Sequence, residues 1–369
     1  MRLSFRMFAH SWTSDWNHGN AHFLRGLAQE LMNLGHEVRC YEEEDSWSRA
    51  NLRQEGSDTE ARALRQFREA FPNLDVRTYR AGSGFADFAE EELRGADIVL
   101  VHEWNRPEVV NTLLELKGKL EFKALFHDTH HRAYTSPKEI LQFNLDQFDG
   151  VLAFGEAIRK LYIDGFGIKR AWTFHEAADT GHFRSFPGEK NADVVWVGNW
   201  GDEERTRELE EFLIQPAASL GSKFAVYGVR YPKHAQARLT TAGVEYRGYL
   251  PNLEAPRVYG ESLITLHVPR RFYANGLSGV PTIRVFEALA CGIPLLCAPW
   301  ADTEGLFTAG DDYLCVDNGC AMEAEIRHFL SDERARQQLS SRGLKTIQQK
   351  HTCAHRANEL MAICEELGR

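Results

Sequence analysis

The sequence predicts an α/β protein with two domains, each built on a parallel sheet whose strands are joined by helices. Short apolar runs alternate with amphipathic segments along the chain, which is the pattern of repeated β–α–β units. A turn-rich stretch at 175–188 separates two such series. The length of 369 residues is sufficient for two domains with full cores. We therefore expect doubly wound domains at residues 1–182 and 183–350, followed by a C-terminal segment at 351–369.

The first domain begins with an apolar strand at 3–9 and a polar loop at 11–20. A helix follows, and Gly35 is placed to cap it in the left-handed conformation before the next strand at 38–41. The charged stretch 42–75 predicts one helix, at 59–71. The remaining elements of this domain are expected at 96–102 (strand), 107–116 (helix), 123–127 (strand) and 150–154 (strand).

The second domain repeats this alternation. Pro281 and Thr282 are suited to begin a helix that Gly292 and Pro294 end. After residue 331 the chain becomes helical and polar, and the last helix is expected at 354–367. Buried strands are expected at 193–198, 224–228, 244–248, 263–267, 294–297 and 313–316.

Composition and charge exclude several classes of protein. The 43% hydrophobic and 26% charged residues describe a globular chain without a disorder signature. A net charge of −10 argues against a nucleic-acid-binding surface. The first ten residues lack the apolar core of a signal peptide, and seven scattered cysteines without a Cys-x-x-Cys pair indicate reduced thiols. We therefore expect a cytoplasmic protein with no nucleic-acid partner.

The helix expected after Thr282 has the features of an anion-binding site. Its first turn offers free N–H groups and the positive end of a helix dipole. Glu287 would lie about 7.5 Å further along the axis, beside the sugar ring of a ligand whose diphosphate sits at the helix start. Arg284 would contact the phosphates or brace Glu287. The pattern is also typical of an ordinary amphipathic helix that leads into a core strand.

Residues 284–292, Arg-Val-Phe-Glu-Ala-Leu-Ala-Cys-Gly, resemble the sugar-donor-site helix of GT-B glycosyltransferases, the glycosyl transferases of group 1. Many relatives carry a second glutamate eight positions before Glu287, where this chain has Gly279. That difference indicates the CgeB-like (spore-maturation type) branch. The tail of this branch is also similar to residues 351–356, His-Thr-Cys-Ala-His-Arg. The resemblance implies two Rossmann-like domains and a C-terminal helix that crosses back to the first.

The resemblance also implies that the second domain binds a nucleotide-diphosphate sugar, with Glu287 on the ribose. The glycine-lined turn after the 193–198 strand would approach the diphosphate through backbone N–H groups. Each of these features has a structural alternative. The glycine-lined turn could be an ordinary turn, Tyr249 could be a core residue, and the loop with Arg271 could be a solvated surface loop. The further candidates for sugar-donor binding are Gly198, Asn199, Trp200, Arg205, Tyr249, Arg271 (next to Arg270), Asn275, Thr282, Ile283 and Arg284.

In the first domain, titratable residues follow strand ends, where active-site groups gather in parallel sheets. His102, Glu103, His127 and Asp128 are candidates for a base that takes the proton of an acceptor hydroxyl. Retaining enzymes of this fold often lack such a base, so substrate binding alone is the alternative. The remaining candidates on the acceptor side are His18, Gly19, Asn20, His130 and His131. For this loop, capping of the first helix by Asn20 or Asn17 is the alternative.

The same residues allow two other functions. The run His127 to His131, with His102 and Glu103, has the ligand types of a metal-dependent hydrolase or phosphatase. A non-catalytic nucleotide-sugar-binding protein is the third interpretation. We expect a metal-independent transferase of the hexosyl or related type, with no cofactor besides its nucleotide-sugar co-substrate. Its acceptor would be a sugar, a peptide, a small molecule or a lipid-linked molecule met at the inner membrane without a spanning helix.

Overall fold

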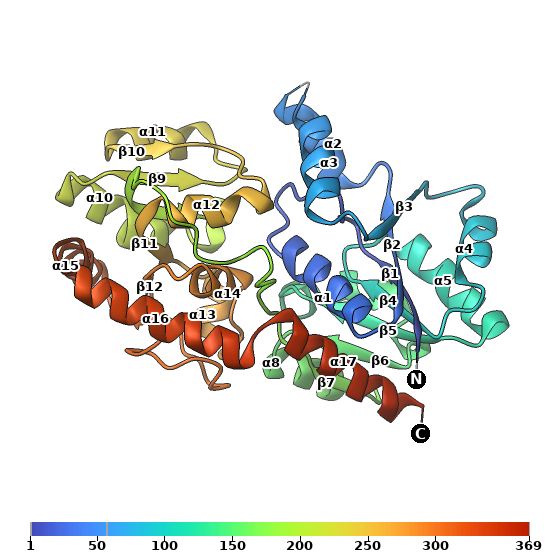
Figure 1. Ribbon diagram of the computed structural model, residues 1–369. Helices are drawn as coiled ribbons and strands as arrows, with labels where there is room; N and C mark the ends of the chain where they lie inside the picture. The colour runs from blue at the N-terminus through green and yellow to red at the C-terminus, as the bar shows by residue number, and fades with distance from the viewer. Residues whose placement is uncertain (1, 57, 369) are drawn as a thin grey trace. The chain divides into compact units, whose positions relative to one another are not determined.

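The computed structural model describes residues 2–56 and 58–368 (Figure 1). Met1, Ser57 and Arg369, which the expected domain ranges include, lie outside the described residues. The chain divides into two compact units. Unit 1 comprises Met1–Glu176 and Cys353–Arg369, and unit 2 comprises Ala177–Thr352.

Unit 1 contains, in its described part, a seven-stranded parallel sheet in the order β3-β2-β1-β4-β5-β6-β7. Its strands are β1 (Ser4–Phe8), β2 (Glu37–Glu43), β3 (Asp75–Tyr79), β4 (Ile98–His102), β5 (Lys123–Asp128), β6 (Gly150–Ala153) and β7 (Ala171–Thr173). The helical segments are α1 (Ala21–Asn33), α2 (Trp47–Glu55), α3 (Thr59–Ala70), α4 (Phe85–Leu93), α5 (Pro107–Leu120), α6 (Arg132–Thr135), α7 (Pro137–Ile140), η1 (Leu141–Phe143), η2 (Leu145–Gln147), α8 (Glu156–Lys160), η3 (Leu161–Gly165) and α17 (Cys353–Leu367).

Unit 2 contains a six-stranded parallel sheet, counted over described residues, in the order β10-β9-β8-β11-β12-β13. Its strands are β8 (Ala192–Val197), β9 (Phe224–Tyr227), β10 (Val244–Tyr246), β11 (Ser262–His267), β12 (Leu295–Cys297) and β13 (Leu314–Cys315). The helical segments are η4 (Asp202–Glu204), α9 (Thr206–Leu209), η5 (Glu210–Ile214), α10 (Gln215–Leu220), α11 (Lys233–Thr241), η6 (Asn252–Glu254), α12 (Ala255–Gly260), α13 (Arg271–Asn275), α14 (Ile283–Ala290), α15 (Gly319–Ser331) and α16 (Glu333–Lys350).

The expected two-sheet α/β fold is confirmed, and most expected strands lie within two residues of their observed bounds. Gly35 and Gly292 end their helices with φ of +89° and +65°, as the sequence predicts. Among other elements, the sequence pattern missed α2, β3 and α4. Strand β3 lies at the edge of its sheet with several half-exposed or exposed positions, so it lacks the continuous apolar run that marks a buried strand.

The C-terminal helix α17 packs against α1, and Figure 1 shows the two side by side. Arg356 donates from Nε to the carbonyl oxygen of His175 at 2.9 Å, and Trp172 on β7 donates from Nε1 to Glu366 at 3.0 Å. The tail motif at 351–356 therefore marks the point where α16 of unit 2 ends and α17 of unit 1 begins.

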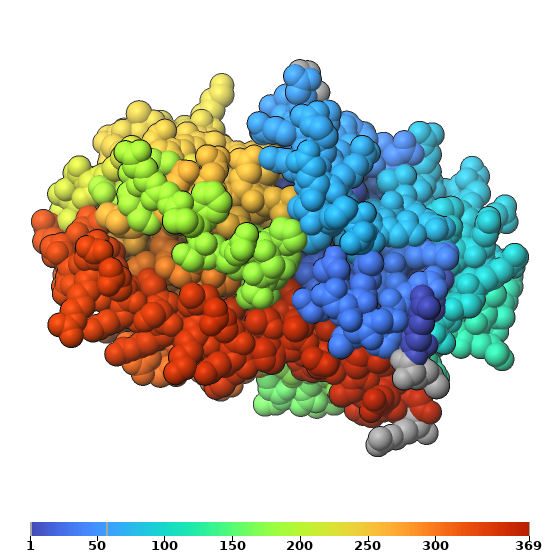
Figure 2. Space-filling model, viewed as in Figure 1, coloured from blue at the N-terminus to red at the C-terminus, as the bar shows by residue number. Residues whose placement is uncertain are grey.

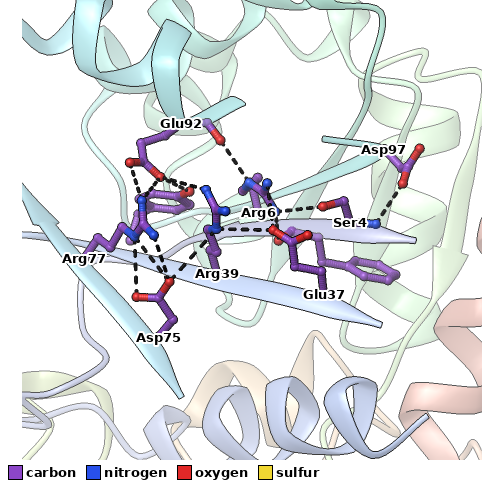
Figure 3. A network of polar contacts seen from close by, with 10 residues as sticks. Ser4, Arg6, Glu37, Arg39, Asp75, Arg77, Glu92 and Asp97 are labelled. Carbon is purple, nitrogen blue, oxygen red and sulfur yellow. Dashed lines mark hydrogen bonds and ion pairs between the residues drawn. The ribbon is translucent and has the colours of Figure 1, made fainter. Parts of the chain in front are cut away.

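An ion-pair network links β1, β2 and β3 to α4 (Figure 3). Arg6 on β1 lies opposite Arg39 on β2, and its Nη2 is 3.1 Å from Glu37 Oε1. Glu92 on α4 lies 2.5 Å from Arg77 Nη1 and 3.5 Å from Arg39 Nη1. Each of the three guanidinium groups thus has a carboxylate partner, so the network stabilises this edge of the sheet without leaving an uncompensated charge.

Both sheets reverse their strand order once, between β1 and β4 in unit 1 and between β8 and β11 in unit 2. In open parallel sheets, ligands bind outside the carboxyl ends of the strands at this switch point. A ligand-binding site is therefore expected in the loops that follow these four strands. In the described part of the chain, no helix is long and apolar enough to cross a membrane, and the seven cysteines are free thiols.

Candidate functional site

Three arginines gather at the switch point of unit 2, and we call Arg205, Arg270 and Arg284 the arginine cluster. Arg205 follows the loop after β8 and donates from Nη1 to the carbonyl oxygen of Val268, directly after β11, at 3.2 Å. Arg270 lies two residues further along that second loop. Asn199 joins the two arginines, because its side-chain oxygen accepts a hydrogen bond from each.

Within residues 2–56 and 58–368, Arg205 is a buried guanidinium without a carboxylate partner. Arg205 is 9% exposed, and its Nη2 donates to the backbone oxygen of Asn199 at 2.7 Å. Its buried Nε has no hydrogen-bond partner among the described residues. Burial and then the charge of Arg270 lower the pKa of Arg205 to about 9. A cation held only by neutral oxygens keeps its full charge, so the site favours an anion.

The other two arginines of the cluster each have one carboxylate. Arg270 pairs with Glu204, and Arg284 pairs with Glu287 one turn further along α14. Three cations therefore face two carboxylates, which leaves one positive charge at the switch point in the described part of unit 2. The charge of Arg284 also contributes to lowering the pKa of Arg205, so the three groups act on one another electrostatically.

The start of α14 is tied to the same edge of the sheet. His267, the last residue of β11, has its Nε2 3.0 Å from Thr282 Oγ1 and its Nδ1 3.6 Å from Cys297 Sγ. Burial and then the charge of Arg205 lower the pKa of His267 to about 3, so this imidazole is neutral at physiological pH. It fixes Thr282 at the N-cap position of α14.

Glu287 has no exposed surface. Its Oε2 accepts a hydrogen bond from Tyr259 Oη at 3.3 Å and pairs with Arg284, while its Oε1 accepts from Asn252 Nδ2 at 3.4 Å. The direct contact with a ribose that the sequence predicts for Glu287 stays a prediction. In this structure Glu287 holds Arg284 and Tyr259 in place.

Two glycines control the space around the cluster. Gly201 has φ +76°, and a Cβ there would lie 2.6 Å from Arg205 Nε. Gly279 has φ +91°, and a Cβ there would lie 2.4 Å from Thr303 Oγ1 and 2.8 Å from Glu304 Cγ. A glutamate at this position would therefore be strained in its backbone and in its contacts.

Several residues expected to bind the sugar donor lie outside the cluster. Trp200 lies in the hydrophobic core against Tyr231, at 5.7 Å between ring centroids. Arg271 binds Glu208 at 2.8 Å, whereas its neighbour Arg270 donates to Asn199. Tyr249 is half-buried after the edge strand β10, and Asn275 is exposed at the end of α13. Ile283 is buried at the start of α14, and Gly198 packs on the ring of Trp196.

The corresponding switch point of unit 1 is lined by aromatic rings and imidazoles, and we call His10, His18, His102 and Trp104 the histidine–tryptophan edge. His10 and His18 follow β1, while His102 and Trp104 lie at the end of β4. The ring centroids of His10 and His18 are 4.3 Å apart, and His102 lies within 5.8 Å of both. Trp104 is 6.1 Å from His10.

These imidazoles are neutral and partly unsatisfied. Burial and then the charge of Arg132 lower the pKa of His10 to about 3, and burial also lowers the pKa of His18 and His102. Neither ring nitrogen of His18, nor Nδ1 of His10, has a hydrogen-bond partner in residues 2–56 and 58–368. Each such buried group costs free energy, so the edge is suited to a ligand that completes its hydrogen bonds.

The two carboxylates expected near an acceptor are buried and paired. Glu103 binds Arg132 through Oε2, at 3.2 Å from Nε and 3.0 Å from Nη2. Asp128 accepts from Tyr162 Oη at 2.7 Å and from the backbone N of His130 at 3.0 Å. Burial raises the pKa of both carboxyls, and the charge of Asp128 raises that of Glu103 further. Both groups thus support the surrounding loop in this structure.

The remaining candidates on the acceptor side lie around this edge. Asn20 occupies the N-cap position of α1 without a side-chain capping bond, and His22 Nδ1 lies 3.1 Å from the carbonyl oxygen of Gly19. His130 and His131 stack at 3.9 Å, and His131 Nδ1 lies 2.9 Å from Thr135 Oγ1. His127 lies apart from these residues, between the rings of Phe23 and Phe174. Burial lowers the pKa of His127 to about 3.

The metal-site alternative requires three or more ligands arranged around one point. Among the described residues, no group of three His, Cys, Asp or Glu side chains could hold a metal ion. The carboxylates of the proposed set, Glu103 and Asp128, are directed to Arg132 and Tyr162. In this structure His102, Glu103 and the side chains of 127–131 therefore do not form such a three-ligand group.

Sequence reasoning missed two members of the two edges, His10 and Trp104, and named Arg270 together with Arg271. His10 follows the end of β1 just as His102 ends β4, so the rule for polar residues at strand ends could have found it. Arg270 was distinguishable from Arg271 only by its partners. Trp104 gave no signal in sequence, because its importance comes from its 40% exposure and from the guanidinium of Arg132 at 3.9 Å over its ring.

A separate cavity of about 390 Å³ lies at the opposite, amino-terminal edge of the unit 2 sheet. It is lined by segment 185–190 and by α16, and Figure 2 shows the face on which these segments (lime green and orange-red) reach the surface. Tyr259 lines it and also bonds Glu287, so the two regions share one side chain.

Comparisons with known proteins agree with this architecture. Residues 205–362 match a family model described as glycosyl transferase-like. No curated protein sequence matches the chain. HepE from Anabaena, in complex with UDP and glucose, is similar with a TM-score of 0.70 and 14% identity over 99% of this chain and 100% of that one.

Two further solved structures are similar. Sucrose-phosphate synthase from Thermosynechococcus elongatus has a TM-score of 0.68 and 14% identity over 99% of each chain. BGT of T4 phage, in complex with UDP and Mn²⁺, has a TM-score of 0.65 and 14% identity over 100% of this chain and 99% of that one. The chain therefore has the GT-B fold, and its residues 205–362 are glycosyl transferase-like.

Proposed function

We propose that this protein is a glycosyltransferase, of the hexosyl or related type, that moves a sugar from a nucleoside-diphosphate donor to an acceptor. The observation that carries the proposal is Arg205, a buried cation without a carboxylate partner in the described chain, at the switch point of unit 2. It begins the region that matches the glycosyl transferase-like model. The presence of UDP in the complexes of HepE and BGT supports a diphosphate as the missing anion.

The arginine cluster supplies the chemistry that such a transfer needs. When the bond between sugar and diphosphate breaks, negative charge develops on the departing phosphate oxygen. Guanidinium groups already fixed by Val268 and Asn199 stabilise this charge without reorganising. We propose that the cluster performs this role without a bound metal ion. Activity that survives exhaustive chelation supports this; activity that Mn²⁺ or Mg²⁺ restores contradicts it.

The finer assignment is to the CgeB-like branch, supported by the resemblance of residues 284–292 and 351–356. Glu287 is proposed to act through Arg284, which it holds beside Arg205. The net charge of −10 favours an acceptor other than a nucleic acid. Because the acceptor hydroxyl must lose a proton, a neutral imidazole of unit 1 or Asp128 is proposed to receive it.

The proposal is tested with the intact protein. Thermal shift and calorimetric titration with UDP, GDP and dTDP should show at least one diphosphate that stabilises and binds the protein. Arg205→Ala should weaken that binding roughly ten- to a hundredfold, since hydrogen bonds to charged groups are worth about 1.5–3 kcal/mol. Arg238→Ala, which removes an exposed arginine of α11 paired with Glu210, is the control.

Two outcomes oppose the proposal. Absence of binding by all three diphosphates, or equal binding by the Arg205 and Arg238 variants, removes the sugar-donor site from this edge. If a nucleotide sugar binds but is neither hydrolysed nor transferred to any acceptor, the non-catalytic binding protein is the correct interpretation.

A further inference from the structure

The histidine–tryptophan edge of unit 1 combines an aromatic surface with hydrogen-bonding groups that have no protein partner in the described chain. Trp104 is 40% exposed at the end of β4. The guanidinium carbon of Arg132 lies 3.9 Å from the centroid of its ring, and Arg132 is itself fixed by two bonds to the fully buried Glu103. The ring of His130 packs against Trp104 at 5.1 Å, in an edge-to-face arrangement. The indole is therefore held in place, with exposed ring surface left for a ligand.

The polar part of the edge lies next to this surface. His10 is 6.1 Å from Trp104 and 4.3 Å from His18, measured between ring centroids. His18 is 6% exposed, and both of its ring nitrogens are buried without a partner among the described residues. A neutral imidazole offers one N–H donor and one acceptor nitrogen. A hydroxyl group matches both, because it donates and accepts.

The charge of the edge limits the ligand further. Burial keeps His10, His18 and His102 neutral at physiological pH. The two arginines whose charge acts on these imidazoles are compensated: Arg132 by Glu103, and Arg25 by Asp15 at 3.3 Å. No uncompensated charge among these groups would attract a phosphate or a carboxylate, in contrast to Arg205 in unit 2.

We infer that the histidine–tryptophan edge binds an electrically neutral carbohydrate, which stacks one face of its ring on Trp104 and gives hydroxyl groups to His10 and His18. A sugar ring has both surfaces that this requires, an apolar face of C–H groups and a rim of hydroxyls. The inference rests on the proposed function where it makes this carbohydrate the acceptor. It thereby selects a neutral sugar over peptide, anionic and lipid-phosphate acceptors.

The test measures sugar binding to the intact protein without any nucleotide. Saturation-transfer NMR and tryptophan fluorescence are recorded with glucose, galactose, mannose and their methyl glycosides, up to about 100 mM. Glucose 6-phosphate and a serine-containing tripeptide serve as the charged and peptide comparisons. We expect at least one neutral sugar to bind, and to bind more tightly than either comparison.

The variants identify the surface. Trp104→Ala and His18→Ala should each weaken sugar binding roughly tenfold or more, whereas Trp104→Phe, which keeps a flat ring, should weaken it less. Trp47→Ala is the matched control, because Trp47 is also an exposed tryptophan of unit 1 but packs on Trp16, outside the edge. The unfolding midpoint and diphosphate affinity of each variant show that it is folded.

The sugar-binding experiments can fail or succeed independently of the nucleoside-diphosphate experiments that test the proposed function. The inference is overturned if no neutral sugar binds, if the phosphate or the peptide binds better, or if the Trp104 and His18 variants bind sugar like the Trp47 variant. If sugar binds at this edge but no nucleoside diphosphate binds anywhere, the proposed transfer fails while the carbohydrate site stands.

Discussion

The two sheets reverse their strand order in the same way, yet the side chains at their switch points differ in charge. In unit 2 the edge presents three arginines with two carboxylates, one guanidinium being compensated only by carbonyl and amide oxygens. In unit 1 the edge presents neutral imidazoles and a tryptophan, with its cation Arg132 paired to Glu103. Topology thus gives the two edges the same position in their sheets, and on the two proposals above the residues at the strand ends decide whether the ligand is an anion or a neutral molecule.

A third cluster shows what charged residues do where no ligand is expected. In the network of β1, β2 and β3, each of Arg6, Arg39 and Arg77 has a carboxylate within ion-pair distance (Figure 3). The contrast with Arg205 is one of compensation, not of residue type. The predictions below act on that difference.

The largest expected effect is the acid sensitivity of unit 1. Folding lowers the pKa of His10, His18, His102 and His127, so below pH 6.5 the unfolded chain binds more protons and stability is lost as pH falls. Each histidine contributes up to about 1.4 kcal/mol per pH unit. Glu103 and Asp128, whose pKa values burial raises, offset part of this loss.

We therefore expect unit 1 to lose about 3 kcal/mol between pH 6.5 and 5, and unit 2, where His267 shows the same shift, to lose less. Hydrogen exchange of peptides from the two sheets, compared at pH 7 and pH 5, measures both losses in one sample. His18→Asn should reduce the loss in unit 1. Equal losses in the two units would contradict the assignment of neutral, buried imidazoles.

The second prediction separates binding from stability at Arg205. Arg205→Met should weaken diphosphate binding roughly ten- to a hundredfold but change the free energy of unfolding by less than about 1 kcal/mol, because the lost hydrogen bonds are offset by no longer burying an uncompensated charge. Glu92→Gln in the compensated network should do the reverse, with about 1–3 kcal/mol of destabilisation and unchanged affinity. Urea unfolding and calorimetry measure the two quantities, and a loss of affinity in the Glu92 variant would speak against the contrast.

The third prediction uses two glycines with similar backbones. Gly201→Ala and Gly221→Ala both place a side chain at a positive φ, of +76° and +62°, and each should cost about 1 kcal/mol. A Cβ at Gly201 displaces Arg205, whereas at Gly221 nothing lies within 4 Å. Gly201→Ala alone should also weaken diphosphate binding, by roughly three- to tenfold. Equal affinities of the two variants in the same titration would mean that the position of Arg205 is not critical.

The smallest expected effect is that of salt. Raising the ionic strength from about 0.1 M to 1 M shortens the screening length from about 10 Å to 3 Å. Diphosphate binding should therefore weaken by about two- to fivefold, while neutral-sugar binding at Trp104 should stay constant. Titrations of one preparation with both ligands test this. A comparable loss for the sugar would indicate a charged ligand at the edge of unit 1.

Much of the fold was predictable from the sequence, because parallel strands that are buried on both faces consist of continuous runs of apolar residues. Strands β4, β5, β8 and β11 were all expected close to their observed bounds. Strand β3 was not, since an edge strand with exposed positions resembles a charged loop. Of the expected site residues, Arg205 and His18 lie at the switch points. Trp200 and Arg271 have the right sequence neighbours, but their side chains face the core and Glu208.

The sequence by itself determined the order of the elements and the placing of polar residues at strand ends, because both follow from local periodicity and turn chemistry. Only the tertiary structure decided which of those polar groups have partners. Arg205 is bonded to Val268, 63 positions away, and Glu103 to Arg132, 29 positions away. Compensation of a charge is a property of such distant contacts, and a pattern read along the chain does not contain it.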